Sequence, residues 1–589
     1  MQSRGVAILG VDVGGTFTDA VLVEDGRIRM AKVPTAARQE ESVLAAARAV
    51  GAGDAALERF AHGTTVATNA LLERRGARTA YVGNAGFEHL LHLRRQARAH
   101  LYRPCARWPE PVVSLADCHG VVGRLGPDGE LEPLDLGSLP ELGGVEAVAV
   151  CLLFSFRDPG HELAVVEELR RRYPGVHVVA SHEVAPEFRE YERASTTAVD
   201  AYLAPVAASY LRALASAAAD AGLPEPAVML SSGGVASVDE AAAHPARLLV
   251  SGPAGGVVGA GLLARRAGFA DAIAFDMGGT STDVCLLPGG RAARVAEREI
   301  GGVPVRLPTV DIHTVGAGGG SLVSRDAGGA VHVGPESAGA DPGPACYGRG
   351  GGPTVTDANL LLGRLPAELP GGLVLDRKAA AAALDGIDPE AVVALVEAEM
   401  LRALRVVSVE RGHDPRDFAL VAYGGAGPLH ACALAEELGI ETVLVPAAAG
   451  VLSALGLAAS EERRDRVVSH VRPLGEVGDL PVEGEADVRY RGQSFELTVP
   501  LGDDVAEAFH WAHEQRYGYA DRGREVELVA VRTADVTPGP PLDLPDDAPG
   551  GAPERATGPA CVELDGSTLF IPPGWVGVRD GPSWVVTRG

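Results

Sequence analysis

The sequence Asp12-Val-Gly-Gly-Thr-Phe-Thr-Asp19 recurs as Asp276-Met-Gly-Gly-Thr-Ser-Thr-Asp283, and six of the eight positions are identical. An apolar stretch precedes and follows each copy, so each copy is predicted to form two β-strands joined by a tight Gly-Gly turn. The copies lie 264 residues apart, far beyond the period of a solenoid repeat. The repeat therefore predicts two similar halves, each containing one hairpin.

Length and composition indicate a folded protein of several domains. The chain has 589 residues, enough for three or four domains at about 150 residues each. With 46% hydrophobic and 22% charged residues, it has too much apolar content for a disordered chain. The net charge of −26 argues against a nucleic-acid-binding protein, because phosphate backbones recruit lysine and arginine surfaces.

Cysteine usage and hydropathy predict a cytoplasmic protein. The seven cysteines include no Cys-x-x-Cys pair, so no zinc or redox motif is expected, and unpaired thiols suit a reducing compartment. The longest uncharged stretch, 248–264, contains Pro253 and several glycines, which favours a loop entering a packed helix over a membrane span. The apolar run at 6–11 is too short for a signal peptide.

Strands and helices alternate through most of the chain, as in α/β layers. Helices are predicted at 42–50, 66–75, 162–173, 191–219 and 505–517, and strands at 147–153, 176–180, 418–423 and, as one alternating stretch, 487–499. A Pro/Gly/Asp-rich linker at 537–559 precedes a final β segment at 560–588. We predict three domains, covering residues 1–187, 188–470 and 471–589.

The repeated hairpins suit a phosphate clamp. Consecutive glycines let backbone N–H groups approach phosphate oxygens, and nearby hydroxyls add donors. The carboxylates of Asp12 and Asp276, the predicted catalytic residues, suit a hydrated Mg²⁺ that bridges phosphates. A single copy would favour an ordinary glycine-rich turn, whereas two matched copies favour a clamp. The predicted phosphate-binding residues are Gly14, Gly15, Thr16, Thr18, Gly278, Gly279, Thr280, Ser281 and Thr282.

Together with three further segments, the hairpins resemble the superfamily of sugar kinases, heat-shock chaperones and actin. Residues 249–260 and 449–457 resemble its two connecting helices, and 418–427 resembles its adenosine motif, with Gly424, Gly425, Ala426 and Gly427 against the nucleoside. The resemblance implies a two-lobed actin-like ATPase fold of class α/β, built from duplicated ribonuclease H-like domains, with a C-terminal α+β or β-rich domain. It also implies ATP and Mg²⁺ as cofactors.

Longer motifs resemble the hydantoinase A/5-oxoprolinase family. They lie at 62–70, 275–283, 311–321, 338–348, 354–359 and 423–430, and the resemblance extends over about 6–460 and 487–533. It implies an ATP-dependent hydrolase, or its ATP-binding A subunit, that phosphorylates the amide oxygen of a hydantoin, 5-oxoproline or a similar cyclic amide before the ring opens. The alternative within the family is the ATP-binding subunit of an acetone- or acetophenone-type carboxylase.

Two hypotheses of other classes stay open. A non-catalytic module that changes shape with nucleotide would need no substrate, and a sugar kinase would yield a stable phosphorylated sugar. The sequence shows no assured metal triad, Ser/His/Asp set or activated cysteine, so we expect a hydantoinase B-like partner subunit to complete the reaction. The shortened stretch at 460–487 puts the family's usual docking to that partner in doubt, and a homo-oligomer is compatible with the sequence.

Several polar residues allow two interpretations. His62, Thr64, Thr65 and Asn69, at the start of a predicted helix, suit either a substrate site or plain capping beside a packed histidine. Asp311 and His313 share a strand face and suit either a metal or substrate, or a hydrogen-bonded pair. Cys346 is expected to be a structural thiol. His510 and His513, three residues apart, are expected on a solvated helix face.

Overall fold

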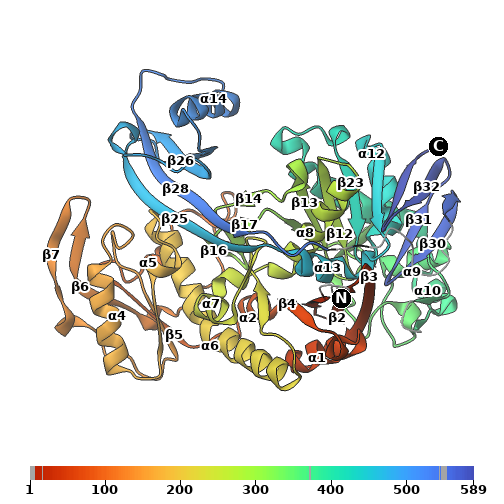
Figure 1. The fold of residues 1–589 in the computed structure, drawn as a ribbon, viewed down its shortest axis with the longest axis horizontal. Coiled ribbons are helices and arrows are strands. Elements are labelled where there is room, and N and C mark those ends of the chain that lie inside the picture. Colours follow the sequence, from red (N-terminus) through yellow and green to blue (C-terminus); the bar gives the residue numbers. More distant parts are fainter. Residues whose placement is uncertain (1–6, 16, 370–372, 543, 545–553) are drawn as a thin grey trace, which may run out of the picture.

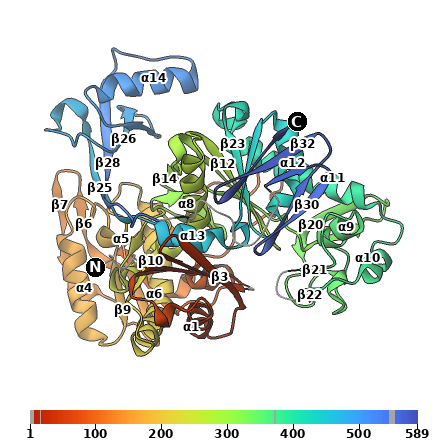
Figure 2. The same cartoon turned by 45° about the vertical axis from the view of Figure 1, so that its right-hand side comes forward.

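Two large β-sheets form the cores of two lobes in the computed structural model, which describes residues 7–15, 17–369, 373–542, 544 and 554–589 (Figure 1). One sheet has ten strands and the other has eight. Between the sheets, the helices α8 (Ser251–Arg266) and α13 (Leu452–Ala459) pack against each other (Figure 2).

In each of the two large sheets, five strands are arranged in the same spatial order. The first set, in spatial order, is β3 (Arg27–Pro34), β2 (Phe17–Glu24), β1 (Ala7–Val13), β4 (Leu57–Gly63) and β10 (Pro226–Met229). The second set is β18 (His313–Val315), β13 (Thr282–Leu287), β12 (Ala272–Met277), β23 (Ala419–Tyr423) and β24 (Thr442–Pro446).

Strand directions also agree between the two sets. In each, the first three strands in chain order are antiparallel neighbours, and the fourth and fifth run parallel to the first. The two halves therefore share the spatial order 3-2-1-4-5. This confirms the duplication predicted from the repeated hairpin and the two-lobed actin-like α/β fold.

Glycines permit the close approach of α8 and α13. A Cβ atom on Gly456 of α13 would lie 1.9 Å from the carbonyl oxygen of Gly255 in α8, and one on Gly10 of β1 would lie 2.0 Å from the carbonyl oxygen of Ala454. Because no side chain fits at either point, α13 packs directly on the backbone of both α8 and the central strand of the first lobe.

We expect Gly456→Ala to lower the free energy of unfolding by about 1–3 kcal/mol or more, because the added methyl group overpacks the helix crossing. Chemical denaturation would measure the loss. Gly475→Ala is the matched control, since a Cβ atom there has no atom within 4 Å. Equal stability of the two variants would contradict the tight crossing.

An α/β unit is inserted into the first lobe. Its five-stranded sheet has the order β7 (Gly129–Asp135), β6 (Cys118–Gly126), β5 (Thr79–Asn84), β8 (Ala147–Val150) and β9 (His177–Ala180). The helix α6 (Glu190–Asp220) returns the chain to the first lobe, against which it packs through α2 (Val66–Leu72) and α7 (Val238–Ala243). The first lobe therefore continues well beyond residue 187, the predicted boundary.

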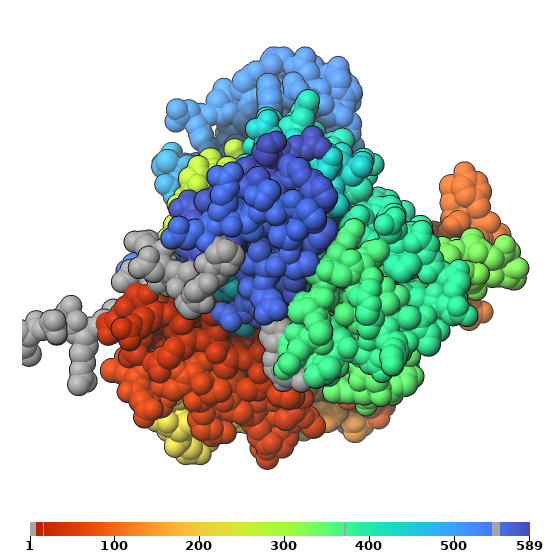
Figure 3. Space-filling view, turned by 90° about the vertical axis from the view of Figure 1, so that its right-hand side faces the viewer, coloured from red at the N-terminus to blue at the C-terminus, as the bar shows by residue number. Residues whose placement is uncertain are grey.

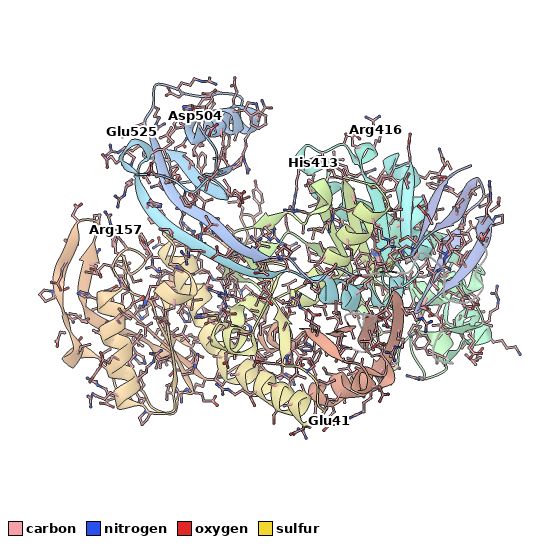
Figure 4. The ribbon with its side chains drawn as sticks, in the orientation of Figure 1. Glu41, Arg157, His413, Arg416, Asp504 and Glu525 are labelled. Carbon is pink, nitrogen blue, oxygen red and sulfur yellow. The ribbon has the colours of Figure 1, made fainter. Side chains whose placement is uncertain are left out.

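The segment 471–589, predicted as one domain, is divided between the lobes. β25 (Glu462–Pro473), β26 (Glu485–Tyr490), β27 (Leu497–Pro500) and β28 (Val526–Thr537) extend the first sheet. With α14 (Val505–Tyr517) they form an arm, residues 462–537, that projects from the molecule (Figures 1 and 4).

The remaining strands join the second lobe. β29 (Arg555–Thr557), β32 (Trp575–Asp580) and β33 (Ser583–Arg588) extend its sheet beyond β24. β30 (Ala560–Leu564) and β31 (Ser567–Ile571) form a separate hairpin. In the space-filling view this C-terminal segment, in dark blue, borders both the N-terminal part of the chain, in red, and the green part of the second lobe (Figure 3).

The helices predicted from the apolar pattern are confirmed, with ends shifted by a few residues: α1 (Gln39–Ala49), α2, α4 (Gly160–Arg172), α6 and α14. The single strand predicted at 487–499 is wrong, because the chain turns after Tyr490 and returns as β27. The alternation continues through both strands, which hides the turn between them.

His510 and His513 were expected on a solvated face of α14, and that prediction is wrong. Both side chains are buried, and Nδ1 of His510 lies 2.8 Å from the hydroxyl of Tyr490 in β26. The face is covered because the arm's sheet packs on it. Among the described residues, no helix is both long and apolar enough to cross a membrane.

Candidate functional site

The two repeated motifs form hairpins with the same turn. The N–H of Gly14 donates to the carbonyl oxygen of Phe17 at 2.9 Å, and the N–H of Gly278 donates to that of Ser281 at 3.0 Å. The strand registers also match, with Asp12 opposite Asp19 and Asp276 opposite Asp283. Gly15, Gly279 and Thr280 are exposed at the turns, and Thr16 lies outside the described residues.

The charge of Asp12, in the first lobe, acts on Asp276, in the second lobe. Burial, together with the charge of the neighbouring Asp19, raises the pKa of Asp12 to about 7. Burial and Asp283 raise the pKa of Asp276 to about 8, to which the charge of Asp12 contributes. Because each lobe supplies one of these carboxylates, the site exists only where the lobes meet.

Close packing of backbone around these carboxylates explains several glycines. A Cβ atom on Gly63 would lie 2.5 Å from Oδ1 of Asp12, and one on Gly424 would lie 2.1 Å from Oδ1 of Asp276. Oδ1 of Asp12 is shielded from solvent and has no hydrogen-bond partner among the described residues. An orphaned carboxylate oxygen beside a second carboxylate fits a hard, oxygen-ligated cation such as Mg²⁺.

The predicted hydroxyl donors fall into two groups. Thr18 and Thr282 are buried: the Thr18 hydroxyl lies 3.1 Å from that of Thr35, and the Thr282 hydroxyl donates to the carbonyl oxygen of Ala317 at 2.6 Å. These two hydroxyls hold the hairpins in place. Thr280 and Ser281 remain accessible at the second turn.

A glycine-rich loop at 316–320 supports the second hairpin. Gly319 and Gly320 donate their N–H groups to the carbonyl oxygens of Gly278 and Gly279, at 3.0 and 2.7 Å. A Cβ atom on Gly318 would lie 2.7 Å from the backbone of Gly279. The motif at 311–321 was noticed in the sequence, but only the structure places its glycines beneath the hairpin turn.

The predicted adenosine motif lies at the carboxyl end of β23, beside the second hairpin. The N–H of Ala426 donates to the carbonyl oxygen of Met277 at 2.9 Å, and Gly424 adopts a positive φ of 80°. Gly425 follows, and Gly427 begins α12 (Gly427–Leu438). The hydroxyl of Ser567 donates to the carbonyl oxygen of Gly424 at 2.8 Å, which ties the β30–β31 turn to this motif.

The structure accounts for His62 and its neighbours through packing. Nδ1 of His62 lies 3.2 Å from the carbonyl oxygen of Val11, and Nε2 lies 2.8 Å from the hydroxyl of Tyr210. Thr65 occupies the N-cap of α2 without a side-chain cap, and Asn69 donates to its hydroxyl at 3.3 Å. Thr64 accepts from the N–H of Val66 at 3.2 Å.

The buried His62 is expected to weaken the fold in acid. Burial lowers its pKa from 6.5 to about 4, so between these values the unfolded chain takes up a proton that the folded protein does not. Stability from this group is therefore lost as the pH falls from 6.5 to 4, by about 3 kcal/mol. Urea unfolding of His62→Gln should lack this loss, whereas the exposed-site control His100→Gln should keep it. Parallel pH profiles of wild type and His62→Gln would contradict the expectation.

The metal or substrate hypothesis for Asp311 and His313 gains no support from the geometry. Asp311 lies before β18 rather than within it, and its carboxylate forms an ion pair with Arg411. Among the described residues, no group of three or more His, Cys, Asp or Glu side chains could hold a metal ion. Cys346 is buried, and burial raises the pKa of its thiol, as expected for a structural cysteine.

Lys32 is a charged residue beside the first hairpin that the sequence interpretation did not single out. It lies on β3, and its Nζ is 2.5 Å from Oδ1 of Asp19 in the first hairpin. A signal was available, because Lys32 and Lys378 are the two lysines in a chain with 52 lysines and arginines together.

Comparison with known proteins places both halves of the chain in one group. A family model described as hydantoinase/oxoprolinase matches residues 193–466, and one described as the hydantoinase/oxoprolinase N-terminal region matches residues 8–173. The two matches leave residues 174–192 between them.

Similar proteins include full-length relatives. The caprolactamase subunit alpha of Pseudomonas jessenii is 32% identical, and the match covers 99% of each chain. The crystal structure of the ATP-dependent caprolactamase from Pseudomonas jessenii superimposes with a TM-score of 0.86 and 31% identity, covering 99% of this chain and all of that chain. The nucleotide-free structure of acetone carboxylase gives a TM-score of 0.79 and 25% identity, with both chains fully covered.

Proposed function

The chain belongs to the hydantoinase/oxoprolinase family, and from this premise we propose that it is an ATP-dependent enzyme, or the ATP-binding subunit of one, that activates a cyclic amide by phosphorylation. The observation that supports this most is the pair of matched hairpins, which bring Asp12 and Asp276 of different lobes within electrostatic reach of each other.

Phosphorylation would overcome the low reactivity of the amide. Resonance across the C–N bond makes the carbonyl carbon a poor electrophile, and the rotational barrier of about 18–20 kcal/mol reflects that resonance. A bond formed between the γ-phosphorus of ATP and the amide oxygen, with release of ADP, removes the resonance and creates a leaving group. Such a transfer requires chiefly positioning and charge neutralisation.

The residues of the site divide this work between the lobes. Gly14, Gly15, Gly278 and Gly279 would present backbone N–H groups to the phosphates, and Thr280 and Ser281 would add hydroxyl donors. The stretch from Gly424 to Gly427 would hold the adenosine against backbone. Asp12 and Asp276 would hold Mg²⁺ through water, and the bound ion would neutralise phosphate charge.

A partner subunit is part of the proposal. The relative from Pseudomonas jessenii is named as a subunit alpha, which supports an assembly of more than one chain. Beside the proposed nucleotide clamp, the described residues of this chain include no group of three or more metal-ligating side chains with which to activate water. We propose that a hydantoinase B-like subunit opens the phosphorylated ring, shielded from bulk water.

The test is substrate-stimulated ATP cleavage by the purified chain, alone and with a B-like subunit. The substrates would be caprolactam, 5-oxoproline and several hydantoins. We expect slow ATP hydrolysis by the chain alone, and stoichiometric ADP and ring-opened product with the partner. Efficient ring opening by the single chain would refute the partner, and ATP cleavage that no cyclic amide stimulates would refute the substrate class.

A carboxylase subunit is the second candidate, favoured by the full-length structural likeness to acetone carboxylase. Its substrates would be a ketone and bicarbonate rather than a cyclic amide. ATP cleavage that depends on acetone or acetophenone together with bicarbonate would select this alternative over the hydrolase.

A further inference from the structure

Lys32 lies beside the turn of the first phosphate hairpin. It stands opposite Asp19 in the β2–β3 register, and their side chains form an ion pair of 2.5 Å. Nζ is also 5.4 Å from the ring centroid of Phe17, the first residue of β2 after the turn. The Lys32 side chain is 34% exposed, so a ligand can reach its ammonium group.

Elements of the second lobe approach the same lysine. A Cβ atom on Gly566, in the β30–β31 turn, would lie 3.6 Å from Cε of Lys32. The next residue, Ser567, donates its hydroxyl to Gly424 of the adenosine motif. Lys32 therefore lies between the first hairpin and the turn that contacts the predicted nucleoside site.

The charge of Lys32 acts on Asp12 and Asp276, the two carboxylates proposed to hold Mg²⁺ through water. Lys32 is therefore a cation close to the place where the negatively charged phosphates of a bound nucleotide would lie.

We propose that Lys32 contacts the terminal phosphates of the nucleotide and neutralises their charge, with Asp19 as the residue that positions its ammonium group. The proposal rests on the proposed ATP site but not on the identity of the organic substrate. A lysine presents a compact point charge with three donors, whereas arginine presents a larger planar fork.

Amine acylation offers a direct test, because Lys32 and Lys378 are the two lysine targets in the chain. Lys378, near the start of α10 (Arg377–Ala383), is an internal control. The intact chain would be treated with an acylating reagent and its peptides analysed by mass spectrometry. Mg-ATP at about ten times its Kd should slow acylation of Lys32 about tenfold. Acylation of Lys378 should not change, and adenosine should protect neither lysine.

The affinity for nucleotide provides a second measurement. It tests the phosphate contact even if the ion pair with Asp19 makes Lys32 unreactive toward the acylating reagent. Charge-assisted hydrogen bonds contribute about 1.5–3 kcal/mol, so Lys32→Met should weaken ATP binding about 10- to 100-fold while adenosine binding is unchanged. Lys32→Arg should recover part of the affinity, and Lys378→Met should match wild type. Circular dichroism would verify that the variants fold.

These outcomes test the proposed role of Lys32 separately from the proposed enzymatic function. Unchanged ATP affinity in Lys32→Met, or ATP binding that leaves a reactive Lys32 unprotected, would overturn the role of Lys32. The proposed cyclic amide activity could still hold in that case. Conversely, protection of Lys32 by Mg-ATP without any lactam-stimulated turnover would support the phosphate contact and refute the hydrolase.

Discussion

Replacement of both Asp12 and Asp276 by alanine is expected to abolish Mg²⁺-dependent ATP turnover. Preorganised electrostatic groups at reacting centres each contribute on the order of 10²–10³ in rate, so loss of both carboxylates should reduce kcat by more than a thousandfold. Isothermal titration would measure the loss of Mg-ATP binding, and a phosphate-release assay would measure the loss of turnover. Binding that is unchanged in the double variant would refute the site.

The same variant should be as stable as wild type or more so, which distinguishes a lost site from a damaged fold. The pKa of Asp276 is raised from 3.8 to about 8, so the folded protein retains a proton that the unfolded chain releases in this window. The stability of the Mg²⁺-free protein therefore falls as the pH rises from 4 to 8. Because the variant lacks this penalty, its thermal unfolding at pH 8 should not occur below that of wild type.

Arg532→Met is expected to loosen the arm (residues 462–537) and to cost about 3–5 kcal/mol. Arg532 donates to Glu187 at 2.5 and 3.0 Å and to Asp487 at 2.8 and 3.0 Å, and all three side chains are buried. Arg306 donates to the same Glu187 at 2.7 Å. Removal of Arg532 would leave the Asp487 carboxylate buried without its cation, and that uncompensated charge is the source of the loss.

Chemical denaturation would measure that cost, and limited proteolysis would show whether cleavage concentrates in the arm. Arg491→Met is the matched control, because Arg491 pairs with Glu525 on the exposed surface of the same arm (Figure 4). Exposed pairs contribute little to stability. Equal stability of the two variants would mean that the buried network does not hold the arm.

Local sequence patterns predicted the hairpins and most helices because the signals lie within short stretches. The repeat at 12–19 and 276–283 contains its own turn, strand pattern and acidic residues, and the structure gives both copies the same register. Contacts between distant stretches had no such signal. The spacing of His510 and His513 could not reveal that Tyr490, from another element, covers them.

The surroundings on which the proposal for Lys32 rests had no local signal for a related reason. Its partner Asp19 lies 13 residues away and its neighbour Gly566 lies in the C-terminal segment, so no local motif contains them together. Likewise, composition alone could not show that the segment after residue 470 contributes strands to both large sheets. The strands up to residue 537 extend the first sheet, whereas β29, β32 and β33 extend the second.

This return of the chain to the second sheet has a consequence for biosynthesis. β24 receives its outer neighbour β33 only after the ribosome has made the whole arm and the linker, because the two strands are far apart in sequence but pair from 442 to 446 with 583 to 587. Until then the nascent second lobe exposes an unpaired strand edge, a template for aggregation. If translation stopped after β24 but before β33, the released chain would therefore be prone to aggregation. During elongation, chaperones would have to protect the exposed edge of β24.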